Sequence, residues 1–468
     1  MRRTGILIIL FFLLCVFKNS FAQGYEIKVN MPLAANQKIK LAYYFLDKIY
    51  ARDSLLLDNE GLGIFEGDSL LPQGLYMVML DQERHFDLLL GADQQFSLYN
   101  DSINSETMKI KGADETKGFV DYLIFLSDLK KHAQQLEQAY ANASPEKQQE
   151  IRNQLQGLNE KMKAYRAKIH KKLPDSFLYK FLIANDVPQL DIQTLPEDVQ
   201  NNDSLLMIAR FNYQREHFWD NFDYTDERML YTPFFKPKLE TWFNKVLYPA
   251  YDSVKPYVYN FLDDVEAHPR IFQFATSYFL NSSINSKIMG MDALFVDLAN
   301  DYYFSGKAFW ASENSLEKIR ENVLFLKDNL IGHTAPDLMM ESYDGEFISL
   351  HQEEAPLTVV LIYEPNCGHC KVFVPKFHDE VYQKFKDKGL QVFAIYSMDN
   401  KEEWSDFLIK HDLFDWINVW DPEHTTRFKI LLDARTTPGV YVLDENKTII
   451  AKKMDVEQLQ AIISDRLN

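Results

Sequence analysis

The segment that decides the fold of the C-terminal part is VVLIYEPNCGHCKVFVPKF, Val359 to Phe377. It opens with an unbroken apolar run rich in β-branched residues, which is typical of a buried strand. Cys367 and Cys370 follow after a short polar turn. The residues after them have the apolar spacing of an amphipathic helix, which we expect to end near Phe385. The segment therefore predicts a strand, a CxxC turn and a helix in direct succession.

Strand-like and helix-like segments alternate around this motif, over residues 331–468. We expect strands or hairpins at 338–349, 358–363, 391–396, 416–420 and 439–451, and helices at 402–411, 425–432 and 456–467. Strands that alternate with helices and end in a hairpin predict an α/β sheet with helices on both faces.

The upstream sequence predicts two further domains. Residues 23–115 alternate with period two between Asn, Asp and Gly turns, which favours a β-sandwich-like antiparallel β domain. Residues 116–330 have helical periodicity and predict an all-α domain. Its first part reads as a charged helical hairpin, with Ser144 capping the second helix and Pro145 at its first position. We assign these domains no catalytic group, only a structural or recognition role.

Residues 1–22 predict export. Arg2 and Arg3 precede an apolar run over residues 6–17, and Ser20-Phe21-Ala22 supplies small residues before a cleavage site after Ala22. This pattern is that of a secretory signal peptide. The apolar run is shorter than the roughly 20 residues of a spanning helix. We therefore expect a soluble periplasmic protein after cleavage.

The chain has three cysteines in 468 residues. Cys15 lies in the predicted signal peptide, and a lipoprotein anchored through it is the alternative to a soluble protein. Leu14 stands where a lipoprotein signal has a small residue, so we expect no anchor. After cleavage only Cys367 and Cys370 remain, which is too few for a disulfide framework. Their spacing favours a reactive cysteine pair over a structural disulfide.

Composition and charge narrow the class of protein. A hydrophobic fraction of 46% is that of a packed globular protein, and the length indicates two to four domains. The net charge of −18 at pH 7 disfavours binding to a phosphate backbone. We therefore expect no nucleic-acid partner.

The CGHC sequence places a thiol at the start of a helix. Unpaired amides and the helix dipole at that end stabilise an anion, so Cys367 is expected to be an accessible nucleophile with a pKa of about 3.5 to 7.5. Cys370 lies one turn later and is expected to resolve the mixed disulfide. We assign redox tuning to the neighbours Gly368, His369 and Glu364. His369 favours the reduced form by lying near the thiolate.

Other functions of a cysteine pair fit the sequence less well. A zinc site needs four ligands, and only the two cysteines with His369 or His378 are at hand. Covalent haem attachment needs His directly after the second cysteine, where the chain has Lys371. A peroxidase favours Thr at the position of Glu364. A structural disulfide over so short a loop constrains little chain entropy. We expect no metal and no cofactor other than a redox-active disulfide.

A second motif is Thr437-Pro438, directly before the predicted strand GVYVLD. With it, three segments resemble the thioredoxin superfamily, in particular its TlpA/ResA-like extracytoplasmic branch: HTAPDLMMESYDGEFISL, VVLIYEPNCGHCKVFVPKF and TTPGVYVLDENKTII. The resemblance implies a cis-proline at Pro438 that faces the CxxC motif. It also implies that the backbone of Thr437 pairs with a substrate peptide.

The resemblance further implies roles for individual residues. Cys367 corresponds to the attacking thiol and Cys370 to the resolving thiol. Leu361 stands where thioredoxins have a buried acid, and Glu364 is the nearest substitute. Tyr363 replaces the tryptophan beside the site and is expected at the substrate-docking surface. Upstream, FWDNFDYTDERMLYTPF and SKIMGMDALFVDLANDYY resemble domains of unknown function that are fused to redoxins in exported Bacteroidetes proteins.

Two functions follow as hypotheses. The first is a periplasmic thiol–disulfide oxidoreductase that acts on exported proteins with disulfides or thiols and exchanges electrons with a membrane or periplasmic thiol donor. The family resemblance favours a reductant, whereas His369 favours an oxidant or isomerase. The second is a cell-envelope protein that binds a glycan or peptide through the aromatic and acidic segment His217–Phe235. Aromatics at helical spacing are more typical of a core, and His217 lacks a second metal ligand at helix spacing.

Overall fold

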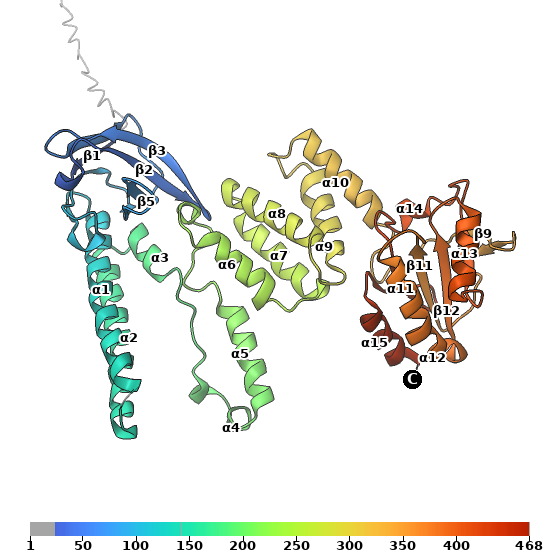
Figure 1. Cartoon of the computed structure of the whole chain (residues 1–468). Helices are drawn as coiled ribbons and strands as arrows, with labels where there is room; N and C mark the ends of the chain where they lie inside the picture. The colour runs from blue at the N-terminus through green and yellow to red at the C-terminus, as the bar shows by residue number, and fades with distance from the viewer. Residues whose placement is uncertain (1–23, 142, 468) are drawn as a thin grey trace, which may run out of the picture. The chain divides into compact units, whose positions relative to one another are not determined.

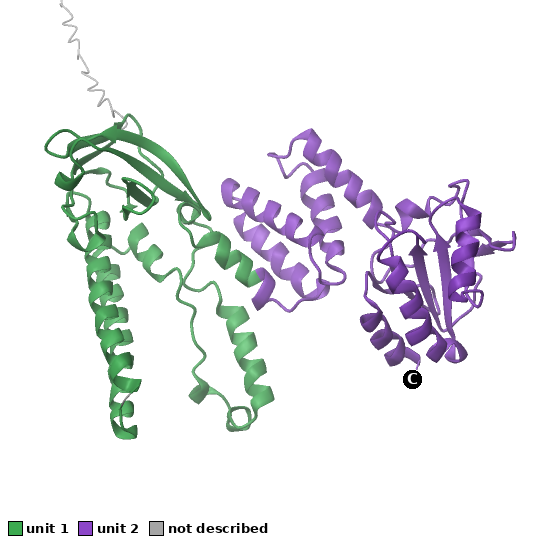
Figure 2. Cartoon of the chain, viewed as in Figure 1, with its two compact units in different colours: residues 1–242 green, residues 243–468 purple. Residues whose placement is uncertain are grey.

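The computed structural model describes residues 24–141 and 143–467, so the predicted signal peptide, with Cys15, lies outside the described residues. The chain forms two compact units that divide between Trp242 and Phe243 (Figure 2). The first unit contains a β domain and helices, and the second contains helices and an α/β domain (Figure 1). In these ranges no helix has both the length and the apolar character needed to cross a membrane.

The β domain consists of two four-stranded sheets with the orders β4-β1-β7-β8 and β3-β2-β5-β6. Their inward side chains, among them Ile27, Ile39 and Leu88, form one apolar core. The strands are β1 Tyr25–Asn30, β2 Lys38–Phe45, β3 Lys48–Leu56, β4 Leu62–Gly67, β5 Gly74–Met79, β6 His85–Leu90, β7 Gln95–Tyr99 and β8 Lys109–Lys111.

One pairing corrects the sequence-based expectation of a purely antiparallel domain. Strand β1 pairs with β7 in parallel, with Ile27 opposite Phe96. Period-two alternation gives the same buried face in parallel and antiparallel strands, so the pattern does not encode strand direction. The sandwich-like architecture is confirmed.

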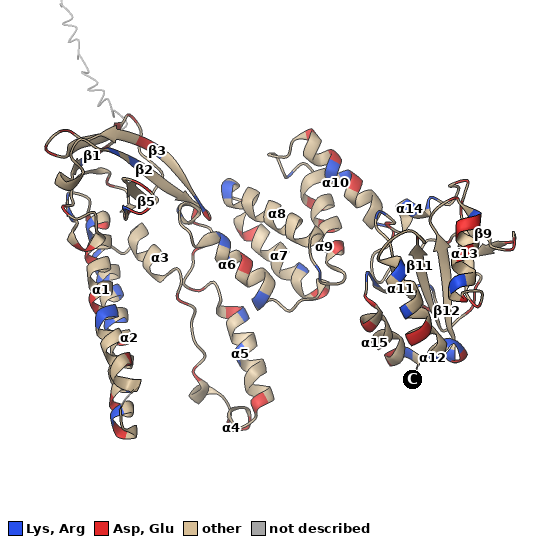
Figure 3. Ribbon diagram, viewed as in Figure 1, with Lys and Arg blue, Asp and Glu red and all other residues tan. Residues whose placement is uncertain are grey.

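The predicted helical hairpin is confirmed as α1 Asp114–Ala141 and α2 Pro145–Lys172. The Ser144 hydroxyl oxygen accepts a hydrogen bond from the Lys147 amide at 3.5 Å and so caps α2. Acidic and basic residues occur along both helices (Figure 3). Their shared buried core is small, which fits a solvated hairpin.

The aromatic segment after α5 (Asp203–His217) belongs to the core of the first unit. Phe218, Phe222 and Phe235 are 3%, 2% and 0% exposed, and the Lys238 ammonium lies 5.0 Å from the centre of the Phe218 ring. Because these rings are packed, they do not form the ligand groove on which the second functional hypothesis rested. Nearby, Nδ1 of His217 lies 2.7 Å from a carboxylate oxygen of Asp220. The remaining helices of this unit are α3 Phe177–Ile183, α4 Glu197–Gln200, α5 Asp203–His217 and α6 Phe235–Thr241.

Among the described residues of the second unit, four α-helices precede the sheet: α7 Tyr251–Val265, α8 Pro269–Ile284, α9 Met291–Leu298 and α10 Glu313–Leu326. The sheet is seven-stranded, with the order β10-β9-β13-β12-β11-β14-β15. Strands β11, β12 and β13 are parallel, and β14 runs antiparallel to β11. The strands are β9 Met339–Ser342, β10 Phe347–Ser349, β11 Leu357–Tyr363, β12 Leu390–Tyr396, β13 Ile417–Trp420, β14 Gly439–Asp444 and β15 Ile449–Lys452.

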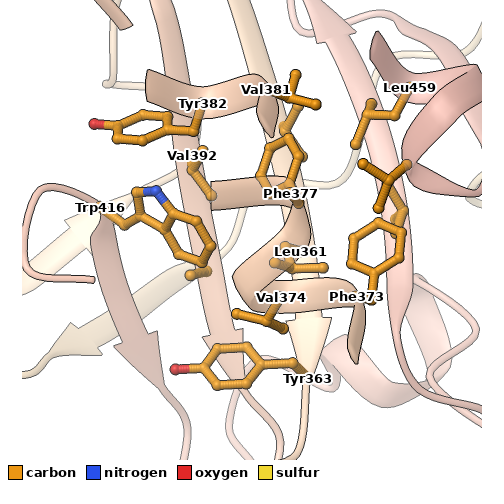
Figure 4. Packing of buried hydrophobic residues seen from close by; sticks show 14 of the residues in the cluster. Leu361, Tyr363, Phe373, Val374, Phe377, Val381, Tyr382, Val392, Trp416 and Leu459 are labelled. Atoms are coloured by element: carbon orange, nitrogen blue, oxygen red, sulfur yellow. The ribbon is translucent and has the colours of Figure 1, made fainter. Parts of the chain in front are cut away.

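Helices cover both faces of this sheet, as the alternation of elements predicted. The larger core lies under the helix that follows the CGHC motif, where Val374, Phe377 and Val381 pack over Leu361 and Val392 (Figure 4). A second core on the other face includes the short helix α14 (Phe428–Leu431). The helices of this domain are α11 Cys370–Phe377, α12 Gln383–Phe385, α13 Lys401–His411, α14 Phe428–Leu431 and α15 Val456–Leu467. A π-helical turn, His378–Tyr382, joins α11 to α12, so the helix ends at Phe385 as predicted.

Candidate active site

The end of β11 positions the first cysteine. The strand stops at Tyr363, and the Cys367 amide donates a hydrogen bond to the Glu364 carbonyl oxygen at 3.1 Å, which closes a tight turn. Helix α11 begins at Cys370, and the Lys371 amide donates to the Cys367 carbonyl oxygen at 3.1 Å. The Cys367 side chain therefore lies just before the helix, where the amides of the first turn lack helical partners.

The two thiols occupy contrasting environments. Cys367 is half-buried, whereas Cys370 is fully buried in the core beneath α11. Both are free thiols in this structure, so it represents the dithiol form. A partner molecule can therefore reach Cys367 more readily than Cys370.

The ionisation of the thiols differs accordingly. A hydrogen bond from the Thr437 side chain lowers the pKa of Cys367 to about 7, and the amides of Cys370 and His369 act in the same direction. Burial raises the pKa of Cys370 to about 11, although the Glu364 amide partly offsets it. Of the two sulfurs, only Cys367 ionises appreciably at neutral pH.

Thr437 and Pro438 lie opposite the CGHC turn. Their peptide bond is cis, as the family resemblance implied. Sγ of Cys367 donates a hydrogen bond to the Thr437 carbonyl oxygen at 3.4 Å. Both residues are partly exposed, so this backbone remains accessible beside the cysteine.

The structure also places the residues assigned to redox tuning. The imidazole of His369 is exposed, and its backbone carbonyl accepts hydrogen bonds from Val372 and Phe373 at the start of α11. Gly368 is exposed, and a Cβ there would meet no atom within 4 Å, so packing does not require glycine. The Glu364 carboxylate accepts a hydrogen bond from the Ser397 hydroxyl at 3.1 Å, and it is the Glu364 backbone amide that acts on Cys370.

Tyr363 corrects one sequence-based assignment. Its side chain is 0% exposed, and its hydroxyl oxygen accepts a hydrogen bond from Nε1 of Trp404 at 2.8 Å. The expectation that Tyr363 lies on the substrate-docking surface is therefore wrong, because the alternating strand β11 turns its ring into the core below Cys370.

A comparison with protein families finds a match to the domain that contains Cys367 and Cys370. The AhpC/TSA family model matches residues 331–452. The C-terminal domain is a thioredoxin-like domain of the AhpC/TSA family. The match does not extend to the upstream domains, so their resemblance to domains of exported Bacteroidetes proteins stays a prediction. Among curated proteins, no sequence matches the chain.

Three of the solved structures that are similar to the chain are named as thiol–disulfide or thioredoxin-like proteins. A domain of a possible thiol-disulfide isomerase from Cytophaga hutchinsonii is 37% identical, with a TM-score of 0.28; the match covers 29% of this chain and 92% of that one. A thioredoxin-like protein from Bacteroides caccae is 17% identical, with a TM-score of 0.46, over 60% of this chain and 98% of that one. A putative thiol:disulfide interchange protein DsbE from Chlorobium tepidum is 21% identical, with a TM-score of 0.27, over 30% and 98%.

Sequence reasoning missed two groups that support the CGHC turn of the thioredoxin-like domain. Ser397 follows β12, and its hydroxyl reaches both the Glu364 carboxylate and the Tyr363 carbonyl oxygen. Asn366 donates a hydrogen bond to the Glu403 carboxylate at the start of α13. The position of Ser397 near the site could have been predicted, because it follows a strand parallel to β11 and the carboxyl ends of neighbouring parallel strands meet at one sheet edge.

Proposed function

We propose that this chain is a periplasmic thiol–disulfide oxidoreductase that exchanges disulfides with exported proteins through Cys367 and Cys370, and that it acts as a reductant. The observation that carries the proposal is the contrast between the two thiols. The accessible sulfur has a pKa of about 7, and the buried sulfur has a pKa of about 11. A nucleophile that ionises at neutral pH beside a protonated second thiol is suited to two-step exchange.

In the first step, the Cys367 thiolate attacks one sulfur of a partner disulfide. A bond forms between Cys367 and that sulfur as the partner's own S–S bond breaks. The released sulfur leaves as a thiolate and takes a proton from solvent. The product is a mixed disulfide between the chain and its partner.

In the second step, Cys370 loses its proton and attacks the sulfur of Cys367. The mixed disulfide breaks, and the second partner sulfur leaves and is protonated. In total the partner disulfide gains two electrons and two protons, and the chain acquires a Cys367–Cys370 disulfide. A membrane or periplasmic thiol donor then reduces this redox-active disulfide, so the cycle uses no further cofactor.

Thr437 and Pro438 supply the docking element in this proposal. The Thr437 carbonyl oxygen, which accepts the Cys367 thiol in the free protein, is available to a substrate backbone once the thiol has ionised. An extended peptide that pairs there lies within reach of the Cys367 sulfur. Backbone pairing of this kind is independent of side-chain identity, which suits several protein substrates.

Two measurements test the proposal. The first is reduction of insulin disulfides by residues 23–468, and we expect Cys367→Ala and Cys370→Ala to lose catalytic turnover. Normal turnover by either variant would refute the mechanism. The second is the reduction potential, which separates a thioredoxin-like reductant at about −270 mV from an isomerase or oxidant at about −180 to −120 mV. A value in the higher range would overturn the assigned direction and leave the exchange chemistry intact.

A further inference from the structure

The loop that carries Thr437 is held by a helix from outside the thioredoxin-like domain. Arg435 lies two residues before Thr437, and its guanidinium donates a hydrogen bond to the side-chain oxygen of Asn322 on α10 at 2.9 Å. The same guanidinium lies 4.4 Å from the centre of the Phe325 ring, also on α10. A guanidinium at this distance from an aromatic ring is attracted to it. Arg435 therefore links the Thr437 loop to α10.

The base of the loop is fixed by a second set of contacts. The Asp433 carboxylate is almost fully buried, and it accepts hydrogen bonds from Nε of Arg435 at 2.5 Å and from Nζ of Lys453 at 2.9 Å. The Lys453 amide in turn donates to the Val440 carbonyl oxygen in β14. Asp433 thus orients the guanidinium so that its free end points to α10.

A third contact joins the segment between α10 and the sheet to the same loop. The buried Asn329 side chain donates a hydrogen bond to the Leu431 carbonyl oxygen at 2.9 Å. Its own side-chain oxygen accepts from Nζ of Lys452 at 2.9 Å. Elements upstream of the thioredoxin-like domain therefore contact the chain at Leu431 and at Arg435, both just before Thr437.

We propose that Arg435 is a positioning residue through which helix α10 holds Thr437 against the Cys367 sulfur. This inference rests on the proposed function of Cys367 as the nucleophile, and it gives the helical part of the second unit a role in that function. Arg435 and Thr436 are exposed, so the loop has little packing of its own at this point. Loss of the α10 contact therefore moves Thr437 away from the Cys367 sulfur, which lies 3.4 Å from its carbonyl oxygen. The side-chain interaction with Thr437 that lowers the pKa of Cys367 is then weakened, so the pKa of Cys367 rises.

The test compares variants in the chain of residues 23–468 by the rate at which iodoacetamide alkylates Cys367 in a Cys370→Ala background. Arg435→Gln removes the guanidinium, and Asn322→Ala removes only its partner on α10. We expect both to slow alkylation at pH 6, by about tenfold for each unit by which the pKa of Cys367 rises. At pH 10, where the thiol is ionised in every variant, we expect equal rates. If Arg435→Gln fails to fold, Asn322→Ala still tests the proposal, because it leaves Arg435 and its contact with Asp433 in place.

Two further variants separate positioning from stability. Arg320→Gln is the matched control, because Arg320 lies on α10 but contacts Glu313 instead of the loop; we expect a wild-type alkylation profile. Arg435→Lys keeps the charge without the forked donor, and we expect an intermediate profile. A wild-type pH profile in Arg435→Gln and Asn322→Ala, even with a lowered melting temperature, would overturn the proposal. Alkylation needs no disulfide substrate, so this result is distinct from failure of the proposed function.

Discussion

The sulfur of Cys367 lies 3.4 Å from the carbonyl oxygen of Thr437, a residue 70 positions later in the chain. The contact joins the CGHC turn to the loop before β14, and in it the thiol donates its proton to the carbonyl oxygen. The pKa of Cys367 is lowered to about 7, and the main cause is hydrogen bonding by the Thr437 side chain.

The first prediction concerns the pH dependence of Cys367 in the dithiol form. The thiolate is the reactive species, so alkylation by iodoacetamide should rise with pH, reach half its maximum near the pKa of about 7 and then level off. Cys370, with a pKa of about 11, should remain unmodified over this range. Mass spectrometry of the alkylated chain assigns the modified residue. A midpoint near the ordinary thiol value would contradict the site electrostatics.

The second prediction isolates the Thr437 hydroxyl. Thr437→Val keeps the backbone carbonyl and the side-chain shape but removes the donor, so the alkylation midpoint of Cys367 should rise. Neutral hydrogen bonds are typically worth about 1 kcal/mol, which corresponds to a shift of somewhat less than one pKa unit. Thr436→Val is the matched control, because Thr436 is exposed and adjacent. Equal shifts of the Cys367 alkylation midpoint in Thr437→Val and Thr436→Val would show that the Thr437 hydroxyl has no specific role in lowering the pKa of Cys367.

The third prediction follows from the burial of Tyr363. Tyr363→Phe leaves the buried Nε1 of Trp404 without its acceptor, so the free energy of unfolding should fall by about 1–3 kcal/mol. Because the ring does not reach the surface, KM for a disulfide substrate should stay unchanged. Denaturant titration measures the first effect, and steady-state kinetics measures the second. A raised KM with an unchanged free energy of unfolding in Tyr363→Phe would indicate that Tyr363 contacts the substrate.

The fourth prediction concerns the buried ion pair between Lys452 and Asp292, which joins β15 to α9 at an Nζ–Oδ2 distance of 2.5 Å. The Lys452 side chain is 2% exposed. Lys452→Met leaves the carboxylate without its cation and should destabilise the second unit by about 3–5 kcal/mol. Adding Asp292→Leu should recover the part of the loss that comes from the unpaired carboxylate, because an apolar pair needs no charge compensation. The part that comes from the two hydrogen bonds that Lys452 donates to buried Asn329 should remain. A double variant no more stable than Lys452→Met would show that the unpaired charge is not the cause of the loss.

The sequence predicted the thioredoxin-like domain well because its signals are local. Strand β11 is buried at every position, and its apolar run from Val359 to Tyr363 reflects this burial on both faces. The elements from β9 to α15 lie at nearly the predicted bounds. The position of Cys367 before a helix followed from the same segment. The cis-proline Pro438, which lies opposite Cys367, was implied by the family resemblance. The spacing of residues in the sequence does not by itself indicate that the two are close.

The remaining features depend on contacts between residues far apart in the chain. The parallel pairing of β1 with β7 leaves no trace in period-two alternation. The burial of Tyr363 depends on Trp404, which lies 41 positions later. The link from Arg435 to Asn322 spans 113 positions, and an isolated arginine in a polar loop gives no signal of it.

The central claim is that Cys367 attacks a partner disulfide and Cys370 resolves the product. The most direct measurement is the adduct formed when a disulfide-containing peptide meets Cys370→Ala, with Cys367→Ala beside it, analysed by non-reducing mass spectrometry. We predict a stable mixed disulfide at Cys367 in Cys370→Ala and no adduct in Cys367→Ala. An adduct at Cys370 in Cys367→Ala, with none in Cys370→Ala, would contradict the account.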